Sequence, residues 1–212
     1  MLKDLDHIFR QDYNLSELSE ESVEKDPYKQ FELSFNEIIN TKVKQPNSMI
    51  ISTVSSNGVP SNRVVLLKHF DTSGFVFFSN YNSPKSFEFY DHSQISALIY
   101  WNSINVQIRM KAHIKKTNRD FNQVYFAKRD MKKNALAICS NQSSVINSYE
   151  DMQKNYEHSL SQDNLKKCPD YWGGFSFTPY YFEFWEGHES RLNKRELYQL
   201  KNSEWVHSFL QA

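Results

Sequence analysis

The chain has 212 residues, with 25 Lys and Arg against 25 Asp and Glu, so its formal net charge is zero. This length suits one domain with a sizeable core, and the balanced charge gives no overall basic field for nucleic acid or an anionic membrane. No apolar run approaches the roughly 20 residues of a membrane-spanning helix, and the acidic start lacks the apolar core of a secretory leader. We therefore expect a cytoplasmic protein with neither a nucleic-acid nor a membrane partner.

Short motifs for disulfides, metals and nucleotides are missing from the sequence. Cys139 and Cys168 are far apart and form neither a CxxC motif nor a disulfide framework, which fits a reducing compartment. The seven His residues show no metal-ligand spacing, so we expect no metal. The five Gly residues form neither GxGxxG nor a P-loop, which argues against Rossmann and P-loop nucleotide sites.

The N-terminal region divides into a polar segment and a helix. Residues 1–26 are polar and charged, and we expect a mobile segment there before a single domain over residues 27–212. Pro27 opens a helical pattern, because Pro suits the first helical position and apolar side chains recur at helical spacing between Phe31 and Ile39.

Strands dominate the region that follows. They are predicted over residues 49–55, 59–69, 75–79, 94–101 and 106–116. Asn57-Gly58 is typical of a β-hairpin turn, and the last of these strands alternates apolar and polar side chains from Val106 to His113. Ser83-Pro84 predicts a short helix to about Tyr90, with the Ser as N-cap.

Helices occupy the next region before strands return. Asn118 is expected to cap one helix, and a second follows Asn141-Gln142-Ser143-Ser144 with an apolar stripe from Val145 to Tyr156. The C-terminal strands are predicted over residues 171–178, 180–187, 195–201 and 204–210. Strand-rich halves with helices between them, without regular βα alternation, predict an α+β fold with a mostly antiparallel barrel and flanking helices.

Cationic residues flank or occupy several of these strands. Arg63 and Lys68 enclose a run of four aliphatic residues, and Arg191, Asn193 and Arg195 share one face if they lie in a strand. A buried cation costs several kcal/mol unless an anion meets it, so these clusters favour phosphorylated ligands. The alternative for Arg63 and Lys68, which lie five residues apart and face opposite sides of a strict strand, is that both reach water.

Two further pairs allow either a structural or a binding role. Gln142 and Ser143 can cap the following helix or bind a phosphate at its N-terminus. Tyr125 and Arg129 lie four apart, where they can grip one phosphate or form a surface stack. Because no nucleophile–base pair or carboxylate pair stands out, an enzyme of this sequence would depend on a bound cofactor.

A series of motifs, in order along the chain, resembles the pyridoxamine 5′-phosphate oxidase family. These motifs are Arg63-Val-Val-Leu-Leu-Lys68, Phe78-Ser79-Asn80, Asn141-Gln142-Ser143-Ser144, Trp172-Gly-Gly-Phe175, Phe184-Trp185 and Arg191-Leu-Asn-Lys-Arg195. The likeness covers nearly the whole chain and implies an FMN-binding split barrel that forms a homodimer. It also implies the oxidation of pyridoxamine or pyridoxine 5′-phosphate to pyridoxal 5′-phosphate, with oxygen reduced to hydrogen peroxide.

The resemblance also implies roles for individual residues. The positions matching FMN contacts are Arg63, Val64, Val65, Leu66, Leu67, Lys68, Phe78, Ser79, Lys85, Gln107, Gln142, Ser143, Trp185 and Arg195. The positions matching substrate contacts are Arg10, Tyr13, Lys68, Tyr125, Arg129, Lys133, Arg191 and Asn193. Within the second group, Arg191 and Asn193 match catalytic positions, and the segment from Arg10 to Tyr13 matches one that covers the site.

The chain departs from the family pattern at three positions. Pro84 replaces an Arg beside the FMN-phosphate Lys, Lys133 replaces a Ser near the substrate phosphate, and Asn193 replaces a His. These departures leave two alternatives open. One is a flavin oxidase of the same fold acting on another ring, such as a phenazine-type precursor. The other is a non-catalytic protein that binds FMN or pyridoxal phosphate.

Overall fold

The computed structural model describes residues 24–212. Arg10 and Tyr13, and with them nearly all of the predicted N-terminal segment, lie outside the described residues. The single domain predicted over residues 27–212 stays a prediction, because the chain divides into two compact units. We call residues 47–99 and 110–180 the cavity unit. The described residues before Asn47, together with residues 100–109 and 181–212, form the terminal unit.

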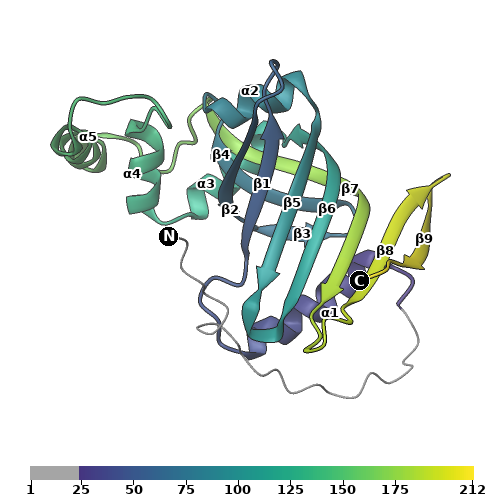
Figure 1. Cartoon of the computed structure of the whole chain (residues 1–212). Helices are drawn as coiled ribbons and strands as arrows, with labels where there is room; N and C mark the ends of the chain where they lie inside the picture. Colours follow the sequence, from purple (N-terminus) through teal and green to yellow (C-terminus); the bar gives the residue numbers. More distant parts are fainter. Residues whose placement is uncertain (1–23) are drawn as a thin grey trace, which may run out of the picture. The chain divides into compact units, whose positions relative to one another are not determined.

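Within the described residues, nine strands form a sheet of order β2-β1-β5-β6-β7-β4-β3, to which β8 and β9 are added beyond β7 (Figure 1). The strands are β1 (Ser48–Val54), β2 (Pro60–Leu66), β3 (His69–Asp71), β4 (Gly74–Asn80), β5 (Gln94–Trp101), β6 (Val106–Lys116), β7 (Trp172–Glu186), β8 (Lys194–Lys201) and β9 (Glu204–Phe209). The pairings of β1 with β2 and β5, and of β4 with β3 and β7, are antiparallel. The α+β, antiparallel architecture predicted from the sequence is confirmed.

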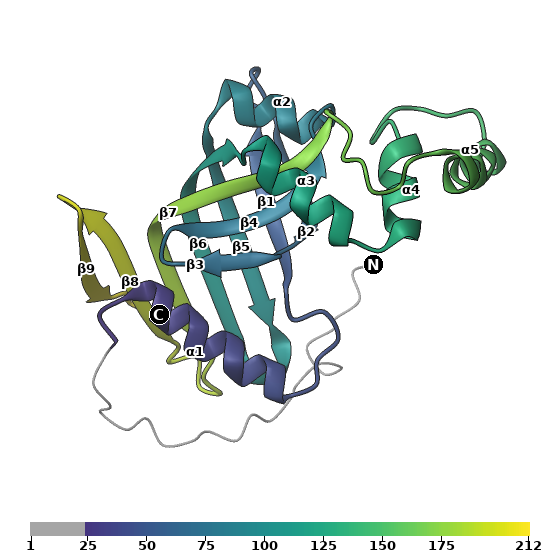
Figure 2. The same cartoon turned by 180° about the vertical axis from the view of Figure 1, so that it is seen from behind.

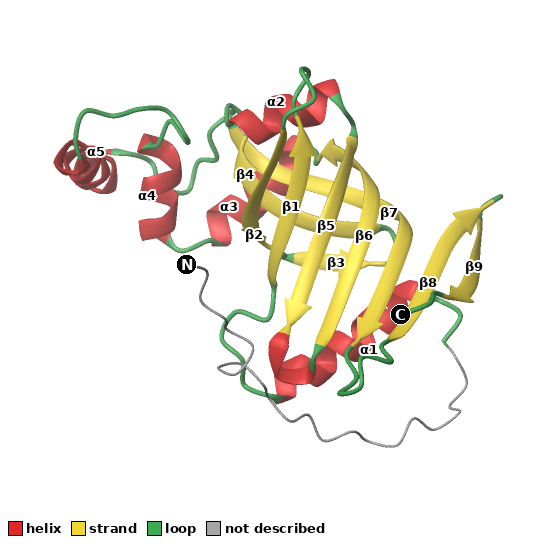
Figure 3. Ribbon diagram, viewed as in Figure 1, coloured by secondary structure: helices red, strands yellow, loops and turns green. Residues whose placement is uncertain are grey.

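The helices are distributed over both units (Figure 3). They are α1 (Pro27–Asn40), α2 (Pro84–Asp91), the short 3-10 helix η1 (Asn102–Ile104), α3 (Arg119–Lys128), α4 (Met131–Cys139) and α5 (Tyr149–Gln162). The Asn118 side chain caps α3 as predicted, by accepting a hydrogen bond from the Phe121 N–H at 2.8 Å. Ser83 is the N-cap residue of α2, but its side chain makes no capping hydrogen bond.

The prediction for the region between α3 and β7 is wrong in two respects. α4 was not predicted, and the next helix begins at Tyr149 rather than directly after Ser144. The Ser148 side chain caps α5, and the acidic Glu150 and Asp151 in its first turn suit the positive end of the helix dipole. Val145, placed on the predicted apolar stripe, is fully exposed and lies outside the helix.

Two strand boundaries also differ from the prediction. β7 runs without a break through Pro179, where two separate strands were predicted. The strand predicted over residues 59–69 ends at Leu66, and β3 begins at His69. Predicted strands 94–101 and 106–116 match β5 and β6 at both ends, because turn residues separate them.

Each unit has an aromatic core. In the cavity unit, Phe75 and Phe77 of β4 lie opposite Phe177 and Phe175 of β7, and all four side chains are buried. In the terminal unit, Phe31 of α1 packs against Trp101, and Tyr28 contacts Phe182 with ring centroids 5.3 Å apart. Helix α1 is seen along its whole length in Figure 2. Among the apolar residues that recur at helical spacing in α1, Phe31 and Ile38 expose no surface, whereas Ile39 is half exposed.

Candidate cofactor and substrate site

A cavity of about 500 Å³ lies within the cavity unit. Strands β2 and β4, helices α2, α3 and α4, and the segment after α4 contribute its lining. The lining includes Val64, Val65, Leu66, Lys68, Phe78, Ser79, Lys85, Tyr125, Arg129, Lys133 and Gln142. The structure therefore brings together, around one cavity, most of the site residues that were predicted before Ser143. Arg63, Leu67 and Gln107 are the exceptions among the described residues: none of them lines the cavity, and the Leu67 side chain is buried.

The cavity lining is strongly cationic. Four cationic residues line the cavity, together with a single acidic residue, Asp130. The cationic residues are Lys68, Lys85, Arg129 and Lys133. The Asp130 carboxylate is itself engaged, because it accepts a hydrogen bond from the Lys133 backbone N–H at the start of α4. Burial, reinforced by the positive charges of Lys133 and Arg129, lowers the pKa of Lys68. Such an arrangement is stabilised when an anion binds.

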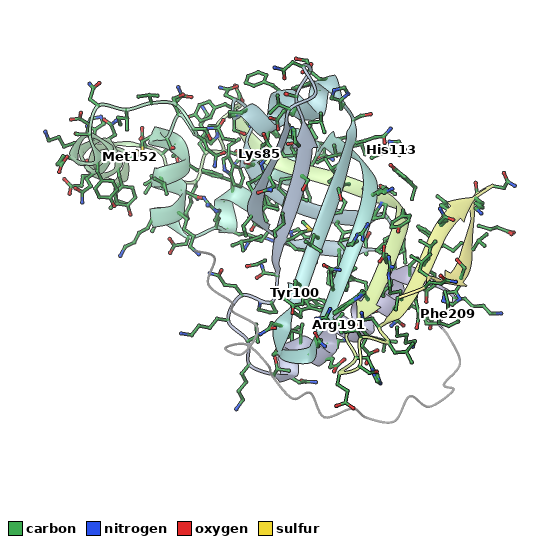
Figure 4. All side chains as sticks on the ribbon, in the orientation of Figure 1. Lys85, Tyr100, His113, Met152, Arg191 and Phe209 are labelled. Carbon is green, nitrogen blue, oxygen red and sulfur yellow. The ribbon has the colours of Figure 1, made fainter. Side chains whose placement is uncertain are left out.

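Lys85 is the most deeply buried of these cations, with 8% of its surface exposed (Figure 4). Its Nζ donates to Ser83 Oγ at 2.7 Å and to Gln142 Oε1 at 2.9 Å. Burial, with a further contribution from the positive Arg63, lowers the pKa of Lys85 to about 8. Among the described residues, no carboxylate forms an ion pair with this amine. Lys85 is thus a buried cation held only by neutral oxygens, which is a favourable position for an anionic ligand.

Gln142 contacts the cavity rather than capping a helix. Its Oε1 also accepts a hydrogen bond from Ser79 Oγ at 3.1 Å, which links the segment after α4 to β4. Because α5 starts at Tyr149, the capping role weighed for Gln142 and Ser143 is wrong, and so is a phosphate site at that helix N-terminus. Ser143 follows in a left-handed conformation, with φ of 72°, and does not line the cavity.

Arg129 ends α3 and is held in place by neighbouring groups. Its Nη1 donates to the Lys133 carbonyl at 2.7 Å and to Asn134 Oδ1 at 3.0 Å, and the guanidinium lies 5.2 Å from the centre of the Trp172 ring. Asn134 is fully buried, and its amide donates to the Phe126 and Leu165 carbonyls. No sequence pattern indicates this positioning role of Asn134, because α4, the helix that carries it, has no predictive signal of its own.

Aromatic side chains form one wall of the cavity. Tyr125 stacks on Phe78 with ring centroids 3.7 Å apart, and Phe78 stacks on Trp172 at 5.2 Å. Gly173 follows Trp172 because a Cβ there would clash with the Tyr81 hydroxyl and the Asn122 amide. The close approach of β7 to these groups therefore fixes the position of the Trp172 wall.

Arg63 forms an ion pair within the protein. This contradicts the expectation that Arg63 is a cation left for an anionic ligand, and also the alternative that its side chain reaches water. Its Nη2 lies 3.1 Å from Glu88 Oε2, and its side chain is only 20% exposed. Its Nη1 donates to the Thr53 hydroxyl, which in turn donates to Glu88.

The other predicted site residues, Gln107, Trp185, Arg191, Asn193 and Arg195, lie in the terminal unit. Arg195 is also paired, because its Nε and Nη2 donate to Glu183 Oε1 at 3.0 and 2.8 Å. Although burial opposes the effect, hydrogen bonds from Arg195 and Tyr181 hold the pKa of Glu183 below its usual value. Trp185 lines a second, small cavity of about 120 Å³.

Arg191, which is labelled in Figure 4, lies in a loop rather than in a strand. Asn193 lies in the same loop. The prediction that they share one strand face with Arg195 is wrong, since β8 begins at Lys194. Arg191 has a left-handed backbone with φ of 63°, and Asn193 Oδ1 accepts a hydrogen bond from the His188 N–H at 3.0 Å. Asn193 thus fixes the loop that carries Arg191.

Known proteins resemble the chain along most of its length. Residues 35–160 match the sequence profile described as pyridoxamine 5′-phosphate oxidase, and residues 172–212 match the pyridoxine 5′-phosphate oxidase C-terminal dimerisation region. A pyridoxine/pyridoxamine 5′-phosphate oxidase of Paraburkholderia phytofirmans is 37% identical over 199 residues, covering 92% of this chain and 93% of the relative. One from Trichormus variabilis is 36% identical, covering 92% of each chain.

Solved structures share the fold. PhzG of Burkholderia lata, solved with tetrahydrophenazine-1-carboxylic acid, has a TM-score of 0.86 at 22% identity, covering 90% of this chain and 94% of that one. An FMN-binding protein of Nostoc punctiforme, related to pyridoxamine 5′-phosphate oxidase, has a TM-score of 0.73 at 12% identity, covering 88% and 98%. No helix in the described part of the chain is long and apolar enough to cross a membrane. On the sequence profile and these relatives, the chain belongs to the pyridoxamine 5′-phosphate oxidase family.

Proposed function

We propose that this protein is an FMN-dependent oxidase that converts pyridoxamine and pyridoxine 5′-phosphate to pyridoxal 5′-phosphate and reduces oxygen to hydrogen peroxide. The main support is the cavity, in which four cations and one acid surround a space walled by stacked aromatic rings. A planar ligand with a phosphate group suits both features, because cations bind the phosphate and the rings pack against its flat faces.

The cavity residues fit a flavin phosphate. Lys85 is a buried amine without a carboxylate partner among the described residues, and Ser79 and Gln142 lie within hydrogen-bond range of one another beside it. We propose that these three residues hold FMN with the backbone of β2, and that Ser143, Gln107, Trp185 and Arg195 also contact it. A bound flavin would supply the redox chemistry, as hydride acceptor for C4′ of the substrate and electron donor to oxygen. With pyridoxamine 5′-phosphate, water would then hydrolyse the oxidised C4′–N bond and release the amine as ammonia.

We propose that Lys68, Tyr125, Arg129 and Lys133 bind the substrate phosphate. Arg129 is preorganised for this role by Lys133 and Asn134, so little side-chain freedom is lost when the phosphate binds. A phosphate anchored away from the reacting carbon aligns that carbon, which contributes several kcal/mol in favourable cases. Arg191 would orient the pyridine ring, and Asn193 would hold the Arg191 loop.

We also propose a cytoplasmic homodimer. The match of residues 172–212 to a dimerisation region supports the dimer, and β9 leaves Val206 and Phe209 exposed in the single chain. Cys139 and Cys168 are free, which fits a reducing compartment. Light scattering of the purified protein should give twice the chain mass. A monomer that retains FMN would contradict the dimer.

One experiment separates this proposal from its alternatives. Purified protein should show a flavin spectrum, lose the absorption when pyridoxamine 5′-phosphate is added without oxygen, and regain it in air with release of peroxide. An oxidase for another ring would keep its absorption with this substrate but lose it with a phenazine-type precursor. A non-catalytic binding protein would keep its absorption with both, and protein without any flavin affinity would contradict the cofactor.

A further inference from the structure

Helix α2 takes part in an ion pair that the proposed reaction does not use. Glu88 on α2 pairs with Arg63 on β2 at 3.1 Å, and the two side chains are only 12% and 20% exposed. The Thr53 hydroxyl closes the arrangement, since it accepts a hydrogen bond from Arg63 and donates one to Glu88. Arg63 also donates to the Ile51 carbonyl at 3.4 Å. The guanidinium is therefore compensated in charge and held in place by the protein itself.

This ion pair lies close to the buried amine of Lys85. Lys85 and Glu88 are three residues apart on α2, so their side chains lie on the same side of the helix. Each partner of the pair acts on Lys85: the positive Arg63 lowers its pKa, and the negative Glu88 raises it. The cluster thus holds two cations and one carboxylate, and only Lys85 lacks an ion-pair partner among the described residues.

We propose that Glu88 sets the affinity of this site for the flavin phosphate, by holding Arg63 in an internal ion pair so that Lys85 supplies the uncompensated charge. This inference rests on the proposed flavin site. Two effects act in the same direction. The Glu88 carboxylate repels a phosphate dianion, and it also neutralises the positive charge of Arg63, which acts on the Lys85 site and would otherwise attract the phosphate. Glu88 is therefore a positioning residue that weakens phosphate binding.

The substitution Glu88→Gln tests this role because it removes the charge and keeps the shape. The amide oxygen of Gln can still accept hydrogen bonds from Thr53 and Arg63, so the local packing is retained. The full-length protein, stripped of flavin, is titrated with FMN and separately with riboflavin, which lacks the phosphate. Binding is followed by quenching of flavin fluorescence. Asp91→Asn is the matched control, since it removes one negative charge from the exposed last residue of the same helix.

We expect Glu88→Gln to bind FMN about tenfold more tightly, which corresponds to about 1.4 kcal/mol, with riboflavin affinity unchanged. Asp91→Asn should change neither affinity by more than about twofold, because solvent and salt screen an exposed charge. A purely structural role of Glu88 would instead weaken both flavins together, because it would disturb the fold without distinguishing the phosphate.

A double-mutant cycle keeps the test decisive if Glu88→Gln folds poorly. Arg63→Gln leaves the Glu88 carboxylate unpaired and should weaken FMN binding at least about tenfold, whereas Arg63→Gln with Glu88→Gln should return it to near the parent value. The inference alone would be overturned if the ratio of the FMN and riboflavin dissociation constants were the same in the parent and in Glu88→Gln. It would also be overturned if the double variant bound FMN no more tightly than Arg63→Gln. A parent protein that binds neither flavin would overturn the proposed cofactor, which is a distinguishable result.

Discussion

Tyr125 and Phe78 stack face to face, with ring centroids 3.7 Å apart and ring planes 9° apart. The contact joins α3 to β4 and orients the Tyr125 phenol at the wall of the cavity. Arg129, the C-cap residue that follows α3, lies over the next ring of that wall, Trp172. The stack therefore holds two proposed phosphate ligands in a fixed relation to each other.

Tyr125→Phe keeps the stack and removes only the hydroxyl. We expect the KM for pyridoxine 5′-phosphate to rise about fivefold, equivalent to about 1 kcal/mol for one hydrogen bond, with kcat little changed. The kcat is spared because a remote anchor stabilises the bound substrate and the transition state alike. Tyr125→Leu, which also removes the stack, should raise KM further. An unchanged KM in Tyr125→Phe would exclude the phenol from phosphate binding.

Lys133 stands where the family resemblance predicts a Ser. We expect Lys133→Ser to weaken the binding of pyridoxal 5′-phosphate about fivefold at low salt, and the difference to shrink as salt screens this exposed charge. Titration at two ionic strengths measures both effects. Lys132→Ser is the control, because the adjacent Lys132 is also exposed but does not line the cavity. An equal loss of pyridoxal 5′-phosphate affinity in the two variants would indicate a general effect of surface positive charge rather than a direct contact with Lys133.

Local sequence patterns predicted correctly those strands and helices whose boundaries are set by their own residues. β5 and β6 were predicted at both ends because alternation and a turn specify each strand locally. α4 was missed because it has no apolar stripe: its buried residues are Asn134 and Ala135. The stripe read from Val145 begins one turn too early, because Tyr149, Met152 and Tyr156 lie in α5 whereas Val145 precedes the helix and is fully exposed.

The geometry of the candidate site could not be predicted from the spacing of residues along the sequence. The Arg191 spacing suggested a strand, but the left-handed backbone at Arg191 makes a loop. Arg63 and Glu88 are 25 residues apart, so only the tertiary structure reveals their pairing. The cavity residues from Val64 to Gln142 were identified through the family resemblance, and periodicity alone left their roles open.

The lowered pKa of Lys85 gives FMN binding a pH dependence. In the free protein Lys85 is charged below about pH 8 and neutral above it. The phosphate group, with a second pKa of about 6, stays a dianion over the same range. Because phosphate binding favours the charged amine, neutral Lys85 must take up a proton on binding, so affinity should fall as pH rises through about 8.

The dissociation constant for FMN, measured by fluorescence from about pH 7 to about pH 9.5, should rise by up to about tenfold per pH unit above pH 8. Riboflavin should show no such change. Lys85→Gln should bind FMN more weakly and with a flat profile over this range. A parent profile that is equally flat would mean that Lys85 does not meet the phosphate.

Arg191 is proposed to orient the substrate ring, and its charge does not titrate in the accessible pH range. We expect Arg191→Met to lower kcat/KM for pyridoxine 5′-phosphate at least about tenfold, or about 1.4 kcal/mol of transition-state stabilisation. FMN affinity, measured by titration of the same variant, should be unchanged. A variant that loses FMN rather than turnover would assign Arg191 to cofactor binding.

Asn193 should act through Arg191, because its Oδ1 accepts a hydrogen bond from the His188 N–H and closes the loop between β7 and β8. Asn193→Ala removes this acceptor, so we expect it to lower kcat/KM about fivefold, whereas Asn193→Asp keeps a carboxylate oxygen there and should lose less. In the Arg191→Met background, Asn193→Ala should add little, since the side chain that the loop positions is already gone. Fully additive losses in steady-state kinetics would show instead that Asn193 contributes to the reaction independently of Arg191.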